Sequence, residues 1–423
     1  MSKTLDLTRR GALGGLALTA ALLAAPVTAG TAHAQDLSGD LTFMIAEYST
    51  NSAPYWEGLA ASFMEEHPGT TINIEAVNWQ QMHDTTVQRI ASGTLPDLVN
   101  TATIWLPEWV EADAIRTIGP DIVSDEVAAD IIPSLLELGA SYKGESWGLP
   151  IAAAGRSLFY NIDLLAEAGY DKPPSDWAGF RQAVIDVHEK TGAFGFAYDG
   201  AGVQAFRYFG FFLWNNGGDF FNEDGTAAFN SDAGVEALEY IVDLASTDAV
   251  PNPSGTTIEE LGPMFTAGRL AMLINGNYFT AALRKDAPDL NFGVAPVPTS
   301  GPDVAPVAWG VTDTLVVAKD APADLTKAFI EHIYTTEART EFDTDVGLLP
   351  LLKSQASLPV FVDDAVTTAF VEQLPSARFD PLHPNYSQMQ EVVKTAMQEA
   401  LAGADAKEVL DDAAETFNEL IEE

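Results

Sequence analysis

The chain has 423 residues, of which 47% are hydrophobic, and carries a formal net charge of −40 at pH 7. This negative charge repels phosphate backbones and anionic lipids, which argues against a nucleic-acid or membrane-surface partner. The absence of cysteine excludes a disulfide framework and a thiolate site, so stability must come from a hydrophobic core, and the length suits two or three domains.

The N-terminus has the pattern of an export signal. Basic residues precede an apolar run from Gly11 to Ala25, and Ala32-His33-Ala34 has the small-x-small form of a signal-peptidase site. The Arg9-Arg10 pair fits a twin-arginine signal, and an ordinary secretory signal fits equally well. We therefore expect residues 1–34 to be removed by cleavage near Ala34 and the mature protein to be periplasmic. No later segment is apolar for long enough to cross a membrane.

From Leu41 the hydrophobic pattern alternates between strand and helix. It predicts strands over residues 41–50, 70–79 and 96–102, separated by helices over residues 53–69 and 80–94. This β-α-β-α-β order indicates an α/β sheet with helices on its faces. Ligands of such sheets bind beyond the carboxyl ends of the strands, where this chain places Tyr48, Trp79 and Thr101.

The rest of the chain continues as an α/β mixture. An aromatic-rich helix is predicted over residues 203–218, and a helix capped by Ser231-Asp232 follows. The apolar strand Leu270–Ile274 ends abruptly in Asn275-Gly276-Asn277-Tyr278, which predicts two amides and a ring presented at a crevice. After a strand over residues 313–319, the last hundred residues are predicted to be mostly helical.

Motifs for catalysis and for metal binding are weak. Gly144-Glu145-Ser146-Trp147-Gly148 matches the G-x-S-x-G nucleophile elbow, which needs a strand before it and a helix after it. Tyr142-Lys143-Gly144 instead predicts a hairpin turn, and Pro150 blocks an immediate helix. The histidines are scattered without metal-ligand spacing, and the sequence has no Walker or G-x-G-x-x-G motif. We therefore expect no metal, no cofactor and no enzyme activity.

Aromatic residues at loop and strand ends are the remaining chemical signal. Ring faces pack against the C–H groups of a sugar, while neighbouring amides, carboxylates and hydroxyls pair with its hydroxyl groups. Core packing is the alternative for each ring, above all for Tyr160 and Trp214, which are flanked by phenylalanine. The candidate rings are Tyr48, Trp79, Trp105, Tyr160, Trp214, Tyr278 and Trp309.

Four segments in order resemble the extracellular solute-binding proteins of ABC importers, in the carbohydrate-type cluster related to maltose-binding protein. They span most of the chain after the signal and are GESWGLPIAAAGRSLFYNIDLLAEAGYDKPPSDW, FTAGRLAMLINGNY, NFGVAPVPTSG and FIEHIYTTEARTEFDTDVGLLPLLKSQ. Within them, Asn275 to Tyr278 matches the family's NGPW, with tyrosine in place of the sugar-stacking tryptophan. Tyr160 matches the tyrosine of its YN motif. Thr101 to Trp105 follows the strand whose end offers polar ligand contacts in the family.

The resemblance implies a periplasmic-binding-protein fold, in which two α/β lobes joined by a three-segment hinge enclose a ligand cleft. It places lobe I at residues 35–153 plus 300–336 and lobe II at residues 154–299 plus 337–423. The crossings are expected near Ala152–Gly155, Thr299–Ala305 and Tyr334–Arg339.

Two arginines leave the charge of the ligand open. Arg156 is a cation where the family commonly has an apolar residue, and Arg378 resembles an arginine that glycerol-phosphate binders aim at an anion. Planar guanidinium donors grip carboxylate or phosphate in pairs. Pairing with surface carboxylates, which this chain has in excess, is the alternative for both arginines.

The family resemblance implies a receptor that captures a sugar or sugar-like polyol and delivers it to the permease subunits of an ABC transporter in the membrane. An anionic sugar or a glycerol phosphate-type ligand is the alternative, and a secreted carbohydrate-active enzyme is a second one. An adhesion module is a further rival, which a ligand-dependent thermal shift would exclude. We expect a monomer.

Overall fold

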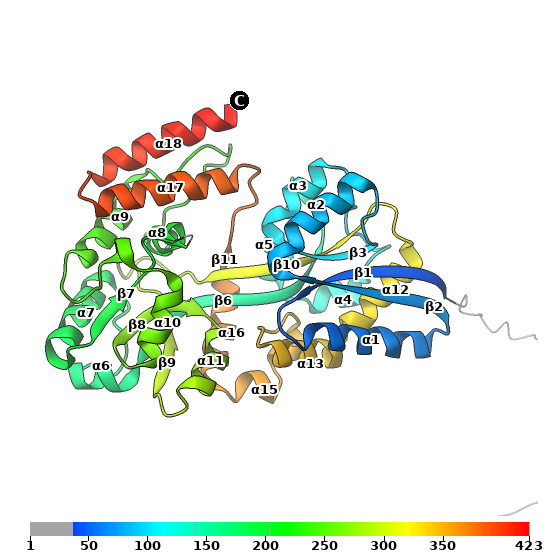
Figure 1. Cartoon of the computed structure of the whole chain (residues 1–423), viewed down its shortest axis with the longest axis horizontal. Coiled ribbons are helices and arrows are strands. Elements are labelled where there is room, and N and C mark those ends of the chain that lie inside the picture. Colours follow the sequence, from blue (N-terminus) through cyan, green and yellow to red (C-terminus); the bar gives the residue numbers. More distant parts are fainter. Residues whose placement is uncertain (1–36, 140, 203, 423) are drawn as a thin grey trace, which may run out of the picture. The chain divides into compact units, whose positions relative to one another are not determined.

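The described residues form a mixed α/β fold around one nine-stranded sheet, which confirms the expected fold class (Figure 1). The computed structural model describes residues 37–139, 141–202 and 204–422, and the expected export signal lies outside these ranges. Within them, no helix combines the length and the apolar character needed to cross a bilayer.

The first part of the chain confirms the predicted β-α-β-α-β order. β1 (Ser38–Glu47) pairs in parallel with β2 (Gly69–Asn78) along its whole length and with β3 (Leu98–Ala102) on its other side. Because the three strands run the same way, their carboxyl ends meet at one edge of the sheet. The connecting helices are α1 (Ser52–Glu66) and α2 (Met82–Ser92).

β6 (Leu149–Asn161) links the two parts of the sheet, whose strand order is β2-β1-β3-β10-β6-β8-β7. Its first half pairs antiparallel with β10 (Trp309–Val317), and from Arg156 onward it pairs with β8 (Leu270–Gly276). β10 also pairs with β3. Figure 1 shows β6 and β10 running between the β1–β3 part and the β7–β9 part. The remaining strands are β4 (Ser141–Tyr142), β5 (Glu145–Ser146), β7 (Phe194–Ala197), β9 (Phe292–Ala295) and β11 (Arg378–Phe379).

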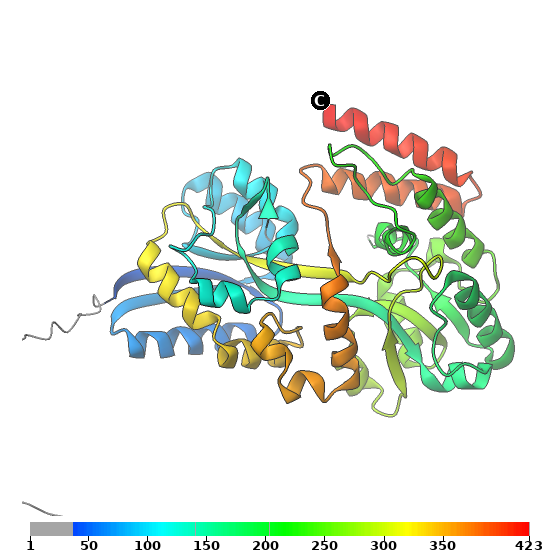
Figure 2. The same ribbon diagram turned by 180° about the vertical axis from the view of Figure 1, so that it is seen from behind.

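Helices pack on both parts of the sheet. α8 (Ala205–Trp214) is buried around its whole circumference, because nearly all of its residues are apolar, and it packs against α9 (Asp232–Ala245) and α17 (Tyr386–Leu401). α16 (Ala365–Gln373), orange in Figure 2, packs on β6 and β9. The other helices are α3 (Leu106–Glu111), α4 (Asp125–Asp130), α5 (Pro133–Gly139), α6 (Ile162–Ala168), α7 (Trp177–Thr191), α10 (Ile258–Thr266), α11 (Phe279–Asp286), α12 (Ala323–Ile333), α13 (Thr336–Val346), α14 (Lys353–Ala356), α15 (Pro359–Val362) and α18 (Ala406–Glu422).

The segment from α13 to α14 contacts α1, β6 and the residues before α5. The hydroxyl of Tyr55 in α1 donates to the carbonyl of Ala338 at 2.6 Å, and the amide of Ile132 donates to the carbonyl of Leu351 at 2.9 Å. The guanidinium of Arg339, fully buried, donates to the carbonyl of Ile151 at 2.7 Å. A buried cation thus joins α13 to β6.

The G-x-S-x-G segment forms a hairpin, as its sequence predicts. β4 and β5 pair around Lys143 and Gly144, whose φ angles of 52° and 79° lie in the left-handed region. No helix follows Ser146, whose hydroxyl contacts the carbonyl of Gly148. The strained strand-to-helix turn of a nucleophile elbow is therefore absent from this described segment.

Candidate functional site

Three half-buried aromatic rings lie in a row at the carboxyl ends of β1, β2 and β3. The ring centroids of Tyr48 and Trp79 are 5.7 Å apart, and those of Trp79 and Trp105 are 5.5 Å apart with nearly parallel planes. His83 of α2 stands edge-on to Trp105 at 4.9 Å. The parallel strands bring these rings together because their ends meet at one edge of the sheet. We call Tyr48, Trp79 and Trp105 the aromatic row.

A buried carboxylate of β10 anchors one end of this row. The hydroxyl of Tyr48 lies 2.6 Å from Oδ2 of Asp313 and 3.0 Å from Oδ1 of Asn100. Burial raises the pKa of Asp313 to about 7, and the hydrogen bond from Tyr48 offsets part of that rise. Asp313 is not among the site residues predicted from the sequence. Its position as an acidic residue in the predicted strand over residues 313–319 could have identified it.

The neighbouring face of β6 and β10 forms a floor of small side chains. Residues directly opposite in antiparallel strands point to the same face, and here Ala152 pairs with Asp313, Ala154 with Val311, and Arg156 with Trp309. Ala154 and Val311 are only partly buried, so this floor is open to solvent between its ends. Four residues of strand place Asp313 and Trp309 roughly 13 Å apart along β10. We call the four residues Ala152, Ala154, Val311 and Asp313 the floor.

Arg156 and Tyr278 stand at the opposite end of the floor from Asp313. Gly276 pairs with Arg156, and a Cβ on Gly276 would lie 2.0 Å from the ring of Tyr278, so this ring covers the glycine on the face that carries Arg156. Arg156 Nη1 donates to the hydroxyl of Tyr278 at 3.1 Å. The Tyr278 side chain is 50% exposed, the only large aromatic among the exposed hydrophobic residues in the described part. The polar end of β8 therefore presents the Tyr278 ring beside the Arg156 guanidinium.

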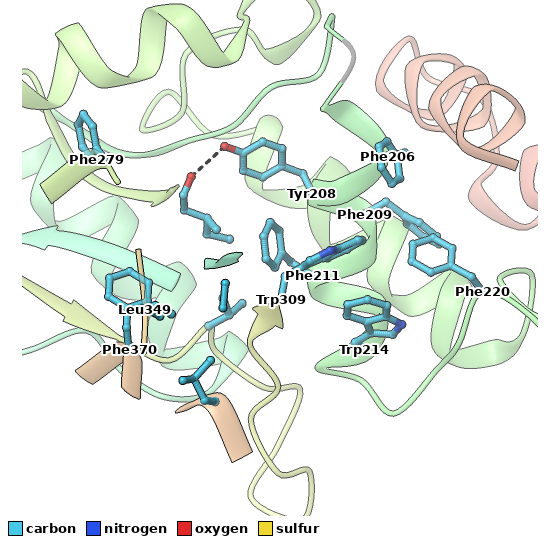
Figure 3. Close-up of a cluster of buried hydrophobic side chains, with 14 of the residues drawn as sticks. Phe206, Tyr208, Phe209, Phe211, Trp214, Phe220, Phe279, Trp309, Leu349 and Phe370 are labelled. Atoms are coloured by element: carbon cyan, nitrogen blue, oxygen red, sulfur yellow. Dashed lines mark hydrogen bonds between the residues drawn. The ribbon is translucent and has the colours of Figure 1, made fainter. Parts of the chain in front are cut away.

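Trp309 and Trp214 are covered, so for these two rings the structure shows the core packing that was the alternative to ligand stacking (Figure 3). Their centroids are 4.1 Å apart, the guanidinium of Arg207 lies 4.8 Å from the Trp309 ring, and that of Arg378 lies 4.9 Å from the Trp214 ring. Trp309 belongs to β10 and not to the proline-rich loop that precedes it. Its indole packs against α8, which leaves it 0% exposed. These two indoles therefore support the site from the core.

Two other expected residues point away from the floor, and a third, Tyr160, lies on the same face of β6 but beyond the end of the floor. Thr101 is fully buried and accepts a hydrogen bond from the indole of Trp109. Asn275 pairs with Ser157, whose hydroxyl donates to Gln373 of α16, so it faces the other side of the sheet. Tyr160 packs on Gly293 of β9, four residues beyond Arg156. Their long-range strand pairings decided these orientations.

Arg378 pairs with a carboxylate, as one of the two alternatives predicted. It forms an ion pair with Asp219, and in the core nearby Arg207 pairs with Asp380, whose Oδ1 also accepts the hydroxyl of Tyr386. Arg156 behaves differently and forms no ion pair with any described residue. The two arginines singled out from the sequence therefore have different surroundings.

Two cavities border the aromatic row and the Arg378 region. One of about 560 Å³ is lined by His83, Trp105 and Glu108 on one side and by His383 and Tyr386 on the other. A second of about 580 Å³ lies between the β4–β5 hairpin and residues 378–382. Both draw their walls from segments far apart in sequence, which is why periodicity could not reveal them. His83 and Tyr386 carried no motif that would have identified them.

The strand pair β6 and β10, which joins two helix-covered parts of the sheet, agrees with the architecture that the resemblance to solute-binding receptors implies. The sequence matches the bacterial extracellular solute-binding protein family over residues 46–340, and the chain belongs to that family. It is therefore the substrate-binding component of an importer and acts outside the cytoplasm.

Several relatives share most of the chain. A binding protein of Brucella abortus is 28% identical over 382 residues, which cover 89% of this chain and 92% of its own. The arabinooligosaccharide-binding protein of Halalkalibacterium halodurans is 23% identical and covers 78% of this chain and 75% of its own. The solved structure of the sugar-binding protein MalE from Xanthomonas citri superposes with a TM-score of 0.81 at 21% identity, over 90% of this chain and 97% of its own. That likeness confirms the periplasmic-binding-protein fold.

Proposed function

We propose that this protein captures a sugar or a sugar-like polyol on the floor, between the aromatic row and Tyr278. The observation that carries the proposal is the juxtaposition of half-buried rings with small, partly exposed floor residues at Ala154 and Val311. A pyranose or polyol needs an apolar surface for its C–H groups and a polar partner for each hydroxyl group that loses water. Tyr48, Asp313 and Arg156 are the polar groups at the edges of that surface.

The proposed lobes meet along β6 and β10. Lobe I comprises the β1–β3 part together with the segment from α12 to about residue 354. Lobe II comprises the β7–β9 part together with α17 and α18. A ligand that contacts both lobes favours a closed form by its differential affinity for that form, which a membrane permease then recognises. The protein would release the solute unchanged, act as a monomer, and reach the periplasm after cleavage near Ala34.

A thermal-shift screen of mono- and disaccharides, polyols and sugar acids tests this function. Any solute that binds only the folded protein stabilises it by RT ln(1 + [L]/Kd), so a hit at 100 times its Kd adds about 2.7 kcal/mol. Recovery of the hit unchanged after incubation separates a receptor from a carbohydrate-active enzyme. A screen in which no member stabilises the protein, or in which the hit is consumed, contradicts the proposal.

A further inference from the structure

We infer that the ligand carries an anionic oxygen group, a carboxylate or a phosphate, that Arg156 binds; this inference rests on the proposed function. The first observation is that Arg156 lacks a carboxylate partner. Of the nine arginines in the described ranges, seven form an ion pair, and the two that do not are Arg156 and the exposed Arg269. In a chain of net charge −40, a half-buried arginine without an acid is unusual.

The donors of Arg156 are only partly used. Nη1 donates to the hydroxyl of Tyr278, while Nη2 has no acceptor among the described residues and, unlike Nε, is not covered. An uncovered donor without a protein acceptor is one that a ligand oxygen can reach. Guanidinium groups bind carboxylate and phosphate through paired N–H donors, and such charge-assisted hydrogen bonds are stronger than neutral ones.

The acidic residues near this end of the floor form no ion pair with Arg156. Asp380 pairs with Arg207, and Asp219 pairs with Arg378. Oδ1 of Asp199 accepts the backbone amides of Ala201 and Gly202, while its buried Oδ2 has no partner among the described residues. No carboxylate among them neutralises Arg156. The positive charge at the end of the floor is therefore left for a group that arrives with the ligand.

The position of Arg156 suits recognition of one end of a ligand. It pairs with Trp309 at one end of the floor, roughly 13 Å from Asp313 at the other. A sugar lying on Ala154 and Val311 would present its ring to the aromatic row and its anionic substituent to Arg156. The exposed ring of Tyr278, held by the same guanidinium, would close over that substituent.

Matched acidic and neutral sugars test this inference by calorimetric titration. The pairs are galacturonate with galactose, glucuronate with glucose, and glucose 6-phosphate with glucose, so that the carboxylate and phosphate arms separate the two anion sources. The variants are Arg156→Gln, Arg156→Lys and, as a matched loss of charge at an exposed arginine, Arg269→Gln. Unliganded melting temperatures establish that each variant folds.

We expect at least one acidic sugar to bind the parent tenfold or more tightly than its neutral partner. Arg156→Gln should abolish this preference, Arg156→Lys should keep part of it because the charge remains, and Arg269→Gln should keep all of it. A neutral sugar that binds as tightly as its acid, or an Arg156→Gln variant that retains the preference, overturns the inference and leaves the proposed function standing. Equal loss of acidic and neutral binding in Arg156→Gln overturns it too, since Arg156 would then only orient Tyr278. Absence of binding by every member overturns the proposed function with it.

Discussion

The hydroxyl of Tyr48, at the end of β1, lies 2.6 Å from the carboxylate of Asp313, which is 265 positions later in β10. This bond ties the aromatic row to the floor and places a titratable group beneath the proposed ligand. Because Asp313 is almost completely buried, its ionisation is linked to the stability of the fold.

The raised pKa of Asp313, about 7, predicts a pH-dependent cost of ionisation. The folded state holds this proton up to about pH 7, whereas an unfolded aspartate releases it near pH 4. Between these values the unfolded state binds fewer protons, so this group makes the free energy of unfolding fall as pH rises, by up to about 4 kcal/mol, and the loss is complete above pH 7. Asp313→Asn can still accept the Tyr48 hydroxyl and has no such titration. Urea melts at pH 5 and pH 8 should therefore show the variant gaining stability relative to the parent at the higher pH. Parallel pH profiles would contradict the assignment.

Trp309 and Tyr278 should behave oppositely when each is replaced by alanine. Trp309→Ala removes a fully buried indole that packs against Trp214 and Arg207, and should cost about 3–5 kcal/mol of stability. Tyr278→Ala removes a half-exposed ring and should change the melting temperature little, while weakening ligand binding about tenfold. Thermal melts and calorimetry on both variants separate the roles. A stable Trp309→Ala protein that has lost binding would instead make Trp309 a ligand contact.

Filling the floor should block binding. Ala154 is partly exposed on the face of β6 that carries Arg156, so Ala154→Trp should occupy the space of the ligand and reduce affinity at least a hundredfold. Ala281 provides the comparison, since it lines a cavity of about 230 Å³ with Leu349, Phe370 and Tyr278. Leu349 and Phe370 lie on the opposite face of the sheet, where a Cβ on Gly155 would meet them. Ala281→Trp should weaken binding less than Ala154→Trp, and the reverse order would move the site behind the sheet.

The aromatic row should contribute stacking energy. Trp105 is half-buried and borders the 560 Å³ cavity, whereas Trp109 of the same segment is 1% exposed in the core. Trp105→Ala should weaken ligand binding about tenfold with little loss of stability. Trp109→Phe should leave the affinity unchanged and lower the melting temperature. Titration by intrinsic fluorescence measures the affinity of each variant, and thermal melts measure its stability. Unaltered affinity in Trp105→Ala would remove the row from the site.

Local patterns predicted the elements of the first part of the fold and the rings at their ends. The β-α-β-α-β order follows from periodicity within short windows, and parallel pairing of β1 to β3 then places Tyr48, Trp79 and Trp105 together. These contacts required no knowledge of distant segments. The resemblance to solute-binding proteins supplied the rest of the architecture, because it rests on four motifs in order.

Residues whose surroundings depend on distant segments could not be placed in the same way. Trp309 is buried because β10 begins four residues before the predicted strand and meets α8, a helix about a hundred positions earlier. The pairing of β8 with β6 turned Asn275 away from the floor, and the pairing of β10 with β6 placed Asp313 in a buried position. Whether an arginine finds a carboxylate depends on which of 61 acidic residues folds within reach, so only the structure separates Arg156 from Arg378.

A crystal structure of the protein with a solute from the screen tests the central claim most directly. We predict that the solute lies on Ala154 and Val311, with Tyr48 at one end and Arg156 beside Tyr278 at the other. A solute bound instead in the cavity lined by Leu349 and Phe370, on the opposite face of β6, would contradict this account.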